Sequence, residues 1–343
     1  MNEKETTTIT SHLTSSPLKV IVLGSGNSGS GAVYDYLAGR PDVHAPLSQE
    51  FRLIQDPGGL SDLYHSIANG FYLNRASAAI REFREFAIRY GRPKNSHPPG
   101  LDYETDIPGY SEKIEQFVEQ ITEVSYAGLP GCERAKFSPF QSWFWDRKRR
   151  KAKARGEKPT DGTVYLPITK ERFLEEAENF LDRLLNPASG SSETIQNIAI
   201  NQGGSFWSPW SSTRYFGENR KVIVVSRDPR GIYSSQRVKG YAYPGGDVHQ
   251  FCDWFDAAMK HIDREEWGHP EVLHVRYEEF VTRFEEGKVQ VDSFLGIDES
   301  VQSVTDIEQS ARNATKYQDR ISNEEIRVIC ERLKDYLQID VRG

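Results

Sequence analysis

Two periodicities of apolar residues alternate along the chain and predict strands and helices in turn. Short apolar runs that end in polar residues or glycine are typical of strands buried in a parallel sheet. Apolar residues three and four positions apart predict amphipathic helices between these runs. We expect strands over 19–23, 42–46, 194–200, 221–225 and 272–275, and helices after residue 31 and over 60–68, 73–91, 111–125, 170–187, 248–264, 287–296 and 322–338. This alternation predicts an α/β fold whose parallel sheet is covered by helices on both faces.

Other stretches have compositions that predict no regular element. Residues 1–17 are rich in Thr and Ser and have no apolar core, so we expect a disordered tail and no signal peptide. The segment 93–108 is rich in Pro and Gly, which predicts a loop. No run of about 18 apolar residues occurs, so we expect no membrane span.

Charge and cysteine content narrow the class of protein. The net charge of −7 argues against a nucleic-acid partner. Cys132, Cys252 and Cys330 lie far apart, without the spacing of a metal site or a disulfide. We therefore expect no bound metal and a reduced, cytoplasmic compartment. The sequence does not determine the oligomeric state.

The densest charge run covers 147–158 and follows Trp143 and Trp145. One interpretation is a solvated helix end or a mobile loop. The other is a surface that attracts an anionic acceptor or the headgroups of anionic lipids, which would hold the protein peripherally at a membrane. The sequence leaves both open.

The segment from Lys19 to Gly31 predicts a strand, a tight glycine loop and the start of a helix. Glycines let the backbone approach a ligand, and the helix N-terminus adds unpaired N–H donors and partial positive charge. Such a corner is typical of a phosphate or sulfate site. An ordinary strand-to-helix turn is the alternative.

Two nucleotide-binding motifs compete for this loop. Gly24, Gly26 and Gly29 match the G-x-G-x-x-G dinucleotide motif, which also needs an acidic residue at the end of the second strand. Glu50 has about the right distance, but its surroundings are a poor strand end. The ATPase motif fails because Ser30 stands where its lysine should be.

A second motif follows the strand 221–225, where Arg227 is expected at the carboxyl end of the sheet. Ser235 lies about two helical turns further on. The guanidinium group donates two parallel hydrogen bonds, which suits a second phosphate. An ion pair for Arg227 and a plain helix surface for Ser235 are the alternatives.

Together these motifs resemble those of the sulfotransferases that use 3′-phosphoadenosine 5′-phosphosulfate (PAPS). The similarity is greatest to the carbohydrate-modifying, Golgi-type branch, in a soluble, bacterial-like form. It rests on residues 20–37, 221–235, 275–280, 294–297 and 310–326. The motif around Arg227 is the most specific of these, and residues 70–195 match no motif.

The resemblance implies one P-loop-like, three-layer α/β domain over 18–343, with a central, mostly parallel sheet flanked by helices and a helical acceptor-side insertion at about 70–195. It implies that PAPS is the cosubstrate and that its sulfuryl group passes to a hydroxyl of a carbohydrate or glycolipid. In this resemblance the glycine loop holds the 5′-phosphosulfate, Arg227 and Ser235 hold the 3′-phosphate, and Tyr277 lies near the adenine. The residues that it implies for binding are Gly26, Asn27, Ser28, Gly29, Ser30, Gly31, Arg227, Ser235, Tyr277, and Arg312 or Lys316 closing over the nucleotide.

The catalytic residues that the resemblance implies include one departure. Glu50 occupies about the place of the acidic base, with His44 and His97 as rivals. Asn27 stands where the family usually has Lys or Arg, which offsets charge on the leaving oxygen. Another cation is therefore expected to reach in, and the candidates are Arg52, Lys136, Arg214 and Lys316.

Other functions remain open at this point. The uncharged Asn27 favours a binding protein of the same fold without catalysis, and the glycine spacing favours a dinucleotide-dependent oxidoreductase. A kinase is a poorer match because the loop lacks its lysine. Trp207 and Trp210 are expected in a loop after a strand, where aromatic rings suit sugar faces.

Overall fold

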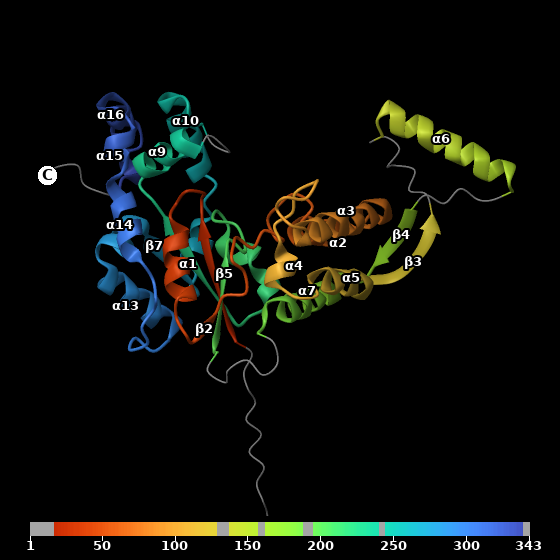
Figure 1. The fold of residues 1–343 in the computed structure, drawn as a ribbon, viewed down its shortest axis with the longest axis horizontal. Coiled ribbons are helices and arrows are strands. Elements are labelled where there is room, and N and C mark those ends of the chain that lie inside the picture. Colours follow the sequence, from red (N-terminus) through yellow and green to blue (C-terminus); the bar gives the residue numbers. More distant parts are fainter. Residues whose placement is uncertain (1–16, 129–136, 157–161, 188–194, 240–243, 339–343) are drawn as a thin grey trace, which may run out of the picture.

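A central sheet of five parallel strands organises the molecule (Figure 1). The computed structural model describes residues 17–128, 137–156, 162–187, 195–239 and 244–338, so nearly all of the expected tail over 1–17 lies outside it. The strand order is β2-β5-β1-β6-β7, and every neighbouring pair is parallel. The strands are β1 (Leu18–Gly24), β2 (Val43–His44), β5 (Asn197–Asn201), β6 (Arg220–Ser226) and β7 (Val272–Arg276). The predicted α/β class is confirmed.

Helices cover both faces of this sheet because its central strands are apolar on both sides. In β1, Ile21 and Leu23 face one hydrophobic core, whereas Val20 and Val22 face the other. The first core is closed by α2 (Leu60–Ala68), α3 (Leu73–Gly91), α5 (Tyr110–Gln120) and α7 (Lys170–Leu185). The second is closed by α1 (Ser30–Ala38), α12 (Tyr277–Thr282), α13 (Phe284–Leu295) and α14 (Ile307–Thr315). The result is the expected arrangement of three layers.

A third apolar cluster lies beside the carboxyl end of β6. It joins α9 (Pro229–Lys239), α10 (Val248–Met259), α15 (Tyr317–Arg320) and α16 (Asn323–Arg332). A capping box starts the last helix, with Ser322 and Glu325 hydrogen-bonded reciprocally. The short elements are α4 (Tyr103–Asp106), α8 (Pro209–Ser212), α11 (Arg264–Trp267) and the 3₁₀ turns Arg214–Phe216 and Lys334–Tyr336.

The largest correction concerns residues 111–125, where a single helix was expected. The helix α5 ends at Gln120, and an antiparallel hairpin of β3 (Thr122–Gly128) and β4 (Gly162–Pro167) begins two residues later. Thr122, Val124 and Tyr126 follow a period of two, which suits a strand, but the partner strand lies some 40 residues away. The insertion at about 70–195 is therefore not purely helical.

Several smaller boundaries also differ from the predictions. The loop expected over 93–108 contains the single turn of α4, and the strand expected over 42–46 is reduced to Val43–His44. The helices expected over 248–264 and 322–338 end earlier, at Met259 and Arg332. In the part of the chain that the structure describes, no helix is long and apolar enough to cross a membrane.

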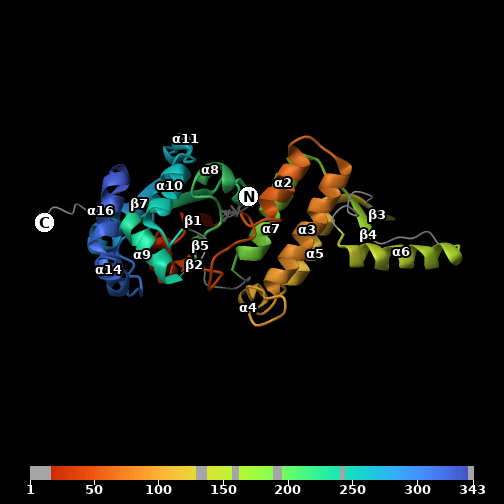
Figure 2. The ribbon, with the colours of Figure 1, turned by 90° about the horizontal axis from the view of Figure 1, so that it is seen from above.

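Eight residues of the basic run, 147–154, form the second half of a helix, α6 (Pro139–Ala154), which lies between β3 and β4 in the sequence (Figure 1). A capping box between Ser138 and Gln141 starts this helix, and Pro139 occupies its first turn. Seen from above, the molecule is elongated, with α6 at the end opposite α16 (Figure 2). Residues 157 and 158 of the run lie outside the described residues.

Candidate active site

One cleft of about 710 Å³ lies where the carboxyl ends of the strands meet. Gly24 ends β1, whereas Gln202, Arg227 and Tyr277 directly follow β5, β6 and β7. All four residues line the cleft. In open α/β sheets, ligands bind in this position. The two sequence motifs that were expected to meet at this edge therefore face a common space.

The glycine loop has a left-handed backbone at three of its positions. Gly26, Asn27 and Gly29 have φ values of 78°, 51° and 81°. A side chain at Gly29 would be excluded, because its Cβ would stand 2.2 Å from the ring of Tyr277. Asn is among the few residues with side chains that tolerate this conformation. The backbone thus gives a physical reason for Asn at position 27, where the resemblance led us to expect Lys or Arg.

The side chain of Gln202 links the glycine loop to the end of β5 by hydrogen bonds. The sequence did not predict this role. Its side-chain oxygen accepts the N–H of Gly24 at 3.3 Å, and its amide donates to Ser30 Oγ at 3.0 Å. Gln202 is buried and has a φ of 61°. Its side chain therefore ties the end of β1 to the first turn of α1. A polar residue directly after a buried strand was the available signal.

The serines of the loop differ in what they offer to a ligand. Ser25 and Ser30 line the cleft, and so does the glycine at position 31. Ser28 is 1% exposed, and its hydroxyl lies 2.0 Å from where a Cβ on Gly24 would stand. The Ser28 side chain is thus packed under the loop. A direct ligand contact for Ser28 Oγ remains a prediction.

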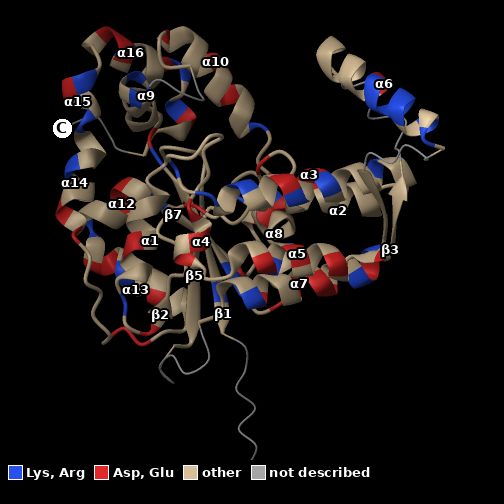
Figure 3. Ribbon diagram, turned by 45° about the vertical axis from the view of Figure 1, so that its right-hand side comes forward, with Lys and Arg blue, Asp and Glu red and all other residues tan. Residues whose placement is uncertain are grey.

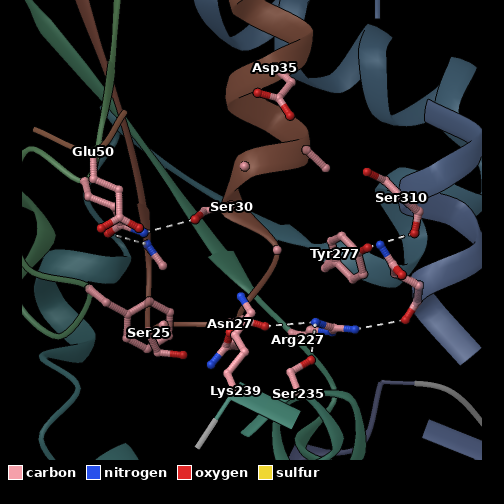
Figure 4. A pocket seen from close by; sticks show the side chains of 18 of the residues that line it. Ser25, Asn27, Ser30, Asp35, Glu50, Arg227, Ser235, Lys239, Tyr277 and Ser310 are labelled. Carbon is pink, nitrogen blue, oxygen red and sulfur yellow. Dashed lines mark hydrogen bonds between the residues drawn. The ribbon is translucent and has the colours of Figure 1, made fainter. Parts of the chain in front are cut away.

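Arg227 joins the loop to the C-terminal part of the chain (Figure 4). One terminal nitrogen of its guanidinium donates to the carbonyl of Asn27 at 3.0 Å, and the other donates to the carbonyl of Asn313 at 2.9 Å. Ser235 Oγ lies 3.5 Å from the first of these nitrogens, and its hydroxyl donates to the carbonyl of Gly231. Both Arg227 and Ser235 line the cleft.

The guanidinium group of Arg227 is mostly buried at the edge of the cleft. Its side chain is 9% exposed, and burial lowers its pKa. Glu278 Oε1 lies 3.9 Å from Arg227 Nε, and burial raises the pKa of Glu278 to about 7. The guanidinium also lies 4.8 Å from the ring centre of Tyr277. These neighbours balance only part of the buried positive charge, which favours an anionic ligand.

Tyr277 is less available for an adenine than the sequence suggested. Its ring is 3% exposed, with Gly29 against it and Arg227 over one face. Its hydroxyl donates to the carbonyl of Ser310 at 2.7 Å. Tyr277 is thus packed between the glycine loop and the C-terminal segment. Its contact with an adenine base stays a prediction.

The cations that line the cleft from the C-terminal region differ from those expected. Arg312 is exposed beside Glu308, and Lys316 donates to the side chain of Asn313, and neither lines the cleft. Arg320, which follows in α15, does line it, and so does Lys239 at the end of α9. Burial is the main cause of the lowered pKa of Arg227, and the charge of Arg320 lowers this pKa further.

Glu50 and Arg52 line the opposite part of the cleft (Figure 4 for Glu50). The Tyr103 hydroxyl of α4 donates to the carbonyl of Glu50 at 2.6 Å and accepts the N–H of Arg52 at 3.0 Å. The guanidinium of Arg52 pairs with Asp56 at 2.9 Å. The backbone of this segment is thereby fixed, while Arg52 has a carboxylate partner of its own.

The remaining candidates lie elsewhere. Arg214 bonds to the carbonyl of Ser211 and does not line the cleft, and Lys136 lies outside the described residues. His44 and His97, the rival bases, do not line it either. Of the tryptophans, Trp207 lines the cleft. Within the described residues, no group of His, Cys, Asp or Glu gathers that could hold a metal ion.

The buried carboxyl of Glu278 predicts a pH dependence of stability. Its folded pKa of about 7 exceeds the ordinary value, so it stabilises the fold at low pH and loses this contribution as pH rises through 7. Between pH 5 and pH 8 the loss is on the order of 2 kcal/mol. The Glu278→Gln variant lacks this titration. Urea unfolding at pH 5 and at pH 8 should therefore show that raising the pH destabilises the wild type more than the variant. Glu279→Gln, at an exposed neighbour, should track the wild type; a Glu278→Gln protein that also tracks it would contradict the assignment.

Comparison of this chain with known proteins finds similarity only to solved structures. No protein-family model matches the sequence, and neither does any curated protein. The chain is similar to the sulfotransferase domain of the Synechococcus PCC 7002 olefin synthase, with 13% identity, 94% of this chain and 96% of that chain covered, and a TM-score of 0.40. It is similar to the sulfotransferase STF9 of Mycobacterium avium (12% identity, 96% and 79% covered, TM-score 0.36). It is also similar to the mouse sulfotransferase SULT7A1 complexed with PAP (15% identity, 40% and 67% covered, TM-score 0.26). Values this low carry no argument about ligand or reaction, so function is inferred from the cleft itself.

Proposed function

We propose that this protein is a PAPS-dependent sulfotransferase that acts on a hydroxyl of a carbohydrate or glycolipid. One observation carries the proposal: the hydrogen bond from Arg227 to Asn27 joins two anion-binding corners in a single cleft. The first corner is the glycine loop with the N-terminus of α1 behind it. The second is Arg227 with Ser235. A nucleotide with phosphate groups at both ends of its ribose would occupy both corners at once.

The charges of the cleft support an anionic ligand. Four basic side chains line it, against two carboxylates, although the chain as a whole has a net charge of −7. The basic residues are Arg52, Arg227, Lys239 and Arg320, and the acidic residues are Asp35 and Glu50. Positive charge gathered in a concave site raises the local concentration of an anion.

Glu50 is proposed as the general base. The acceptor oxygen would attack the sulfur, its proton would pass to the Glu50 carboxylate, and the bond from sulfur to the 5′-phosphate oxygen would break. The products are the sulfate ester and adenosine 3′,5′-bisphosphate. In Figure 4, Glu50 and Ser235 lie on opposite sides of Asn27, and the nucleotide would bind between Glu50 and Ser235. Trp207 lines the same cleft and offers its ring to a sugar face, whereas Phe206 beside it is buried.

Lys239 is proposed as the cation that replaces the missing loop lysine. It extends from the end of α9 into the cleft beside Asn27 (Figure 4). Arg52, the sequence candidate that lines the cleft, is engaged with Asp56. Lys239 would therefore offset the negative charge that develops on the leaving oxygen.

A binding protein without catalysis is the second candidate, because Asn27 carries no charge. The oxidoreductase has less support: β2 ends at His44, so Glu50 does not end the second strand as a dinucleotide site requires.

Removing Arg227 should weaken binding of adenosine 3′,5′-bisphosphate. Losing a charged hydrogen bond costs about 2–3 kcal/mol, so Arg227→Ala should bind about 30- to 150-fold more weakly by calorimetry. Arg312→Ala is the matched control, because Arg312 lies outside the cleft, and its affinity should equal that of the wild type. Equal affinities for wild type and Arg227→Ala would count against the second corner.

Transfer itself is tested with ³⁵S-labelled PAPS and a panel of sugars and glycolipids. We expect labelled product from the wild type and a loss of about 100-fold or more in Glu50→Gln, with nucleotide binding unchanged, because proton transfer contributes about this much. Glu286→Gln, on the exposed side of α13, is the control. Tight nucleotide binding without product from any acceptor would favour the non-catalytic candidate.

The Lys239→Met protein should lose turnover by about 100-fold, as for other groups that stabilise transition-state charge. Lys239→Arg should recover part of it. Arg237→Met removes a charge from the same helix, but Arg237 pairs with Glu325 outside the cleft, so turnover should persist. Normal turnover in Lys239→Met would assign the cation elsewhere.

A further inference from the structure

The helix α6 has a charge opposite to that of the protein as a whole. Its 16 residues, Pro139–Ala154, include six Lys or Arg and one Asp, whereas the net charge of the chain is −7. Figure 3 shows Lys and Arg positions gathered along α6, a helix that stands apart from the helices around the sheet. No part of α6 lines the cleft. Its surface therefore requires an explanation separate from the proposed reaction.

Three large apolar side chains on α6 are exposed. Phe140 is 72% exposed, Trp143 51% and Phe144 59%. Exposed aromatic rings gathered in this way are uncommon on soluble surfaces and mark a contact with another apolar phase or partner. Val124 and Tyr126 of β3, the strand that precedes α6 in the sequence, are also exposed, at 51% and 52%.

The rings and the basic groups share one face of the helix. At 3.6 residues per turn, Phe140, Trp143 and Phe144 lie in line with Arg147 and Lys151. The guanidinium of Arg147 lies 5.6 Å from the ring centre of Trp143. A groove along this face is lined by Trp143, Arg147, Arg150, Lys151 and Ala154. One face of the helix thus offers apolar anchors at its first turns and cations beyond them.

We propose that α6 is an interfacial helix that binds membranes containing anionic lipids. Its rings would enter the boundary between headgroups and acyl chains, and its basic side chains would contact lipid phosphates. Phe has no polar atom with which to contact a soluble polyanion, so burial in an apolar layer suits Phe140 and Phe144 best. Phe140 and Trp143 stack on each other, with ring centres 6.1 Å apart, and so do not stand open to receive nucleic-acid bases between them.

Sedimentation with vesicles tests this proposal on the full chain. We expect binding to phosphatidylcholine vesicles that contain about 30% phosphatidylserine, weaker binding to phosphatidylcholine alone, and a fall in affinity with added salt. The variant Arg147→Gln/Arg150→Gln/Lys151→Gln should bind the anionic vesicles on the order of 100-fold more weakly, at about fivefold per charge.

The matched control neutralises three exposed cations elsewhere, Lys260→Gln/Arg276→Gln/Arg327→Gln, and should bind as the wild type does. A second variant, Phe140→Ser/Phe144→Ser, keeps every charge and should also bind the anionic vesicles more weakly. This loss would show that the rings insert into the membrane, because attraction between charges alone would be unchanged. Equal losses in the control and the α6 charge variant would overturn the proposal. So would binding to heparin or single-stranded RNA without binding to anionic vesicles.

Discussion

The arrangement of the cleft depends on one buried guanidinium. Arg227 donates to the carbonyls of Asn27 and Asn313, which belong to segments nearly 300 residues apart. Burying a charge is costly unless it is paired and hydrogen-bonded. Glu278 and the ring of Tyr277 offset part of that cost. The same contacts fix the glycine loop, the end of β6 and the C-terminal helices relative to one another, and an anion in the cleft would complete the balance of charge.

Backbone geometry and charge make opposing demands on the glycine loop. The left-handed conformation at position 27 favours Asn over Lys. In our proposal the cation is Lys239, at the end of α9, and it lines the cleft. The helix α9 follows β6, the strand that pairs with β1. The loop would then supply backbone N–H groups and shape, while the charge comes from an element that can hold a Lys in ordinary helical conformation.

Local patterns were sufficient to predict those elements of the cleft that are contiguous in sequence, whereas the binding roles of their residues stay predictions. A strand, a glycine loop and a helix are contiguous in sequence, and so are Arg227 and Ser235. Partners distant in sequence were missed: β3 pairs with β4 some 40 residues later, and Gln202 reaches Gly24 across the sheet. Arg320 was missed in favour of Arg312 because the orientation of α14 and α15 depends on their packing against α12 and α9, which are distant in sequence.

The central claim is that one nucleotide is held at both of its anionic ends. Calorimetry of the wild-type protein with adenosine 3′,5′-bisphosphate and with adenosine 5′-monophosphate tests it most directly, because these ligands differ only in the 3′-phosphate. The account predicts that the bisphosphate binds at least about 30-fold more tightly, the equivalent of one charged hydrogen bond. Equal affinities would contradict it.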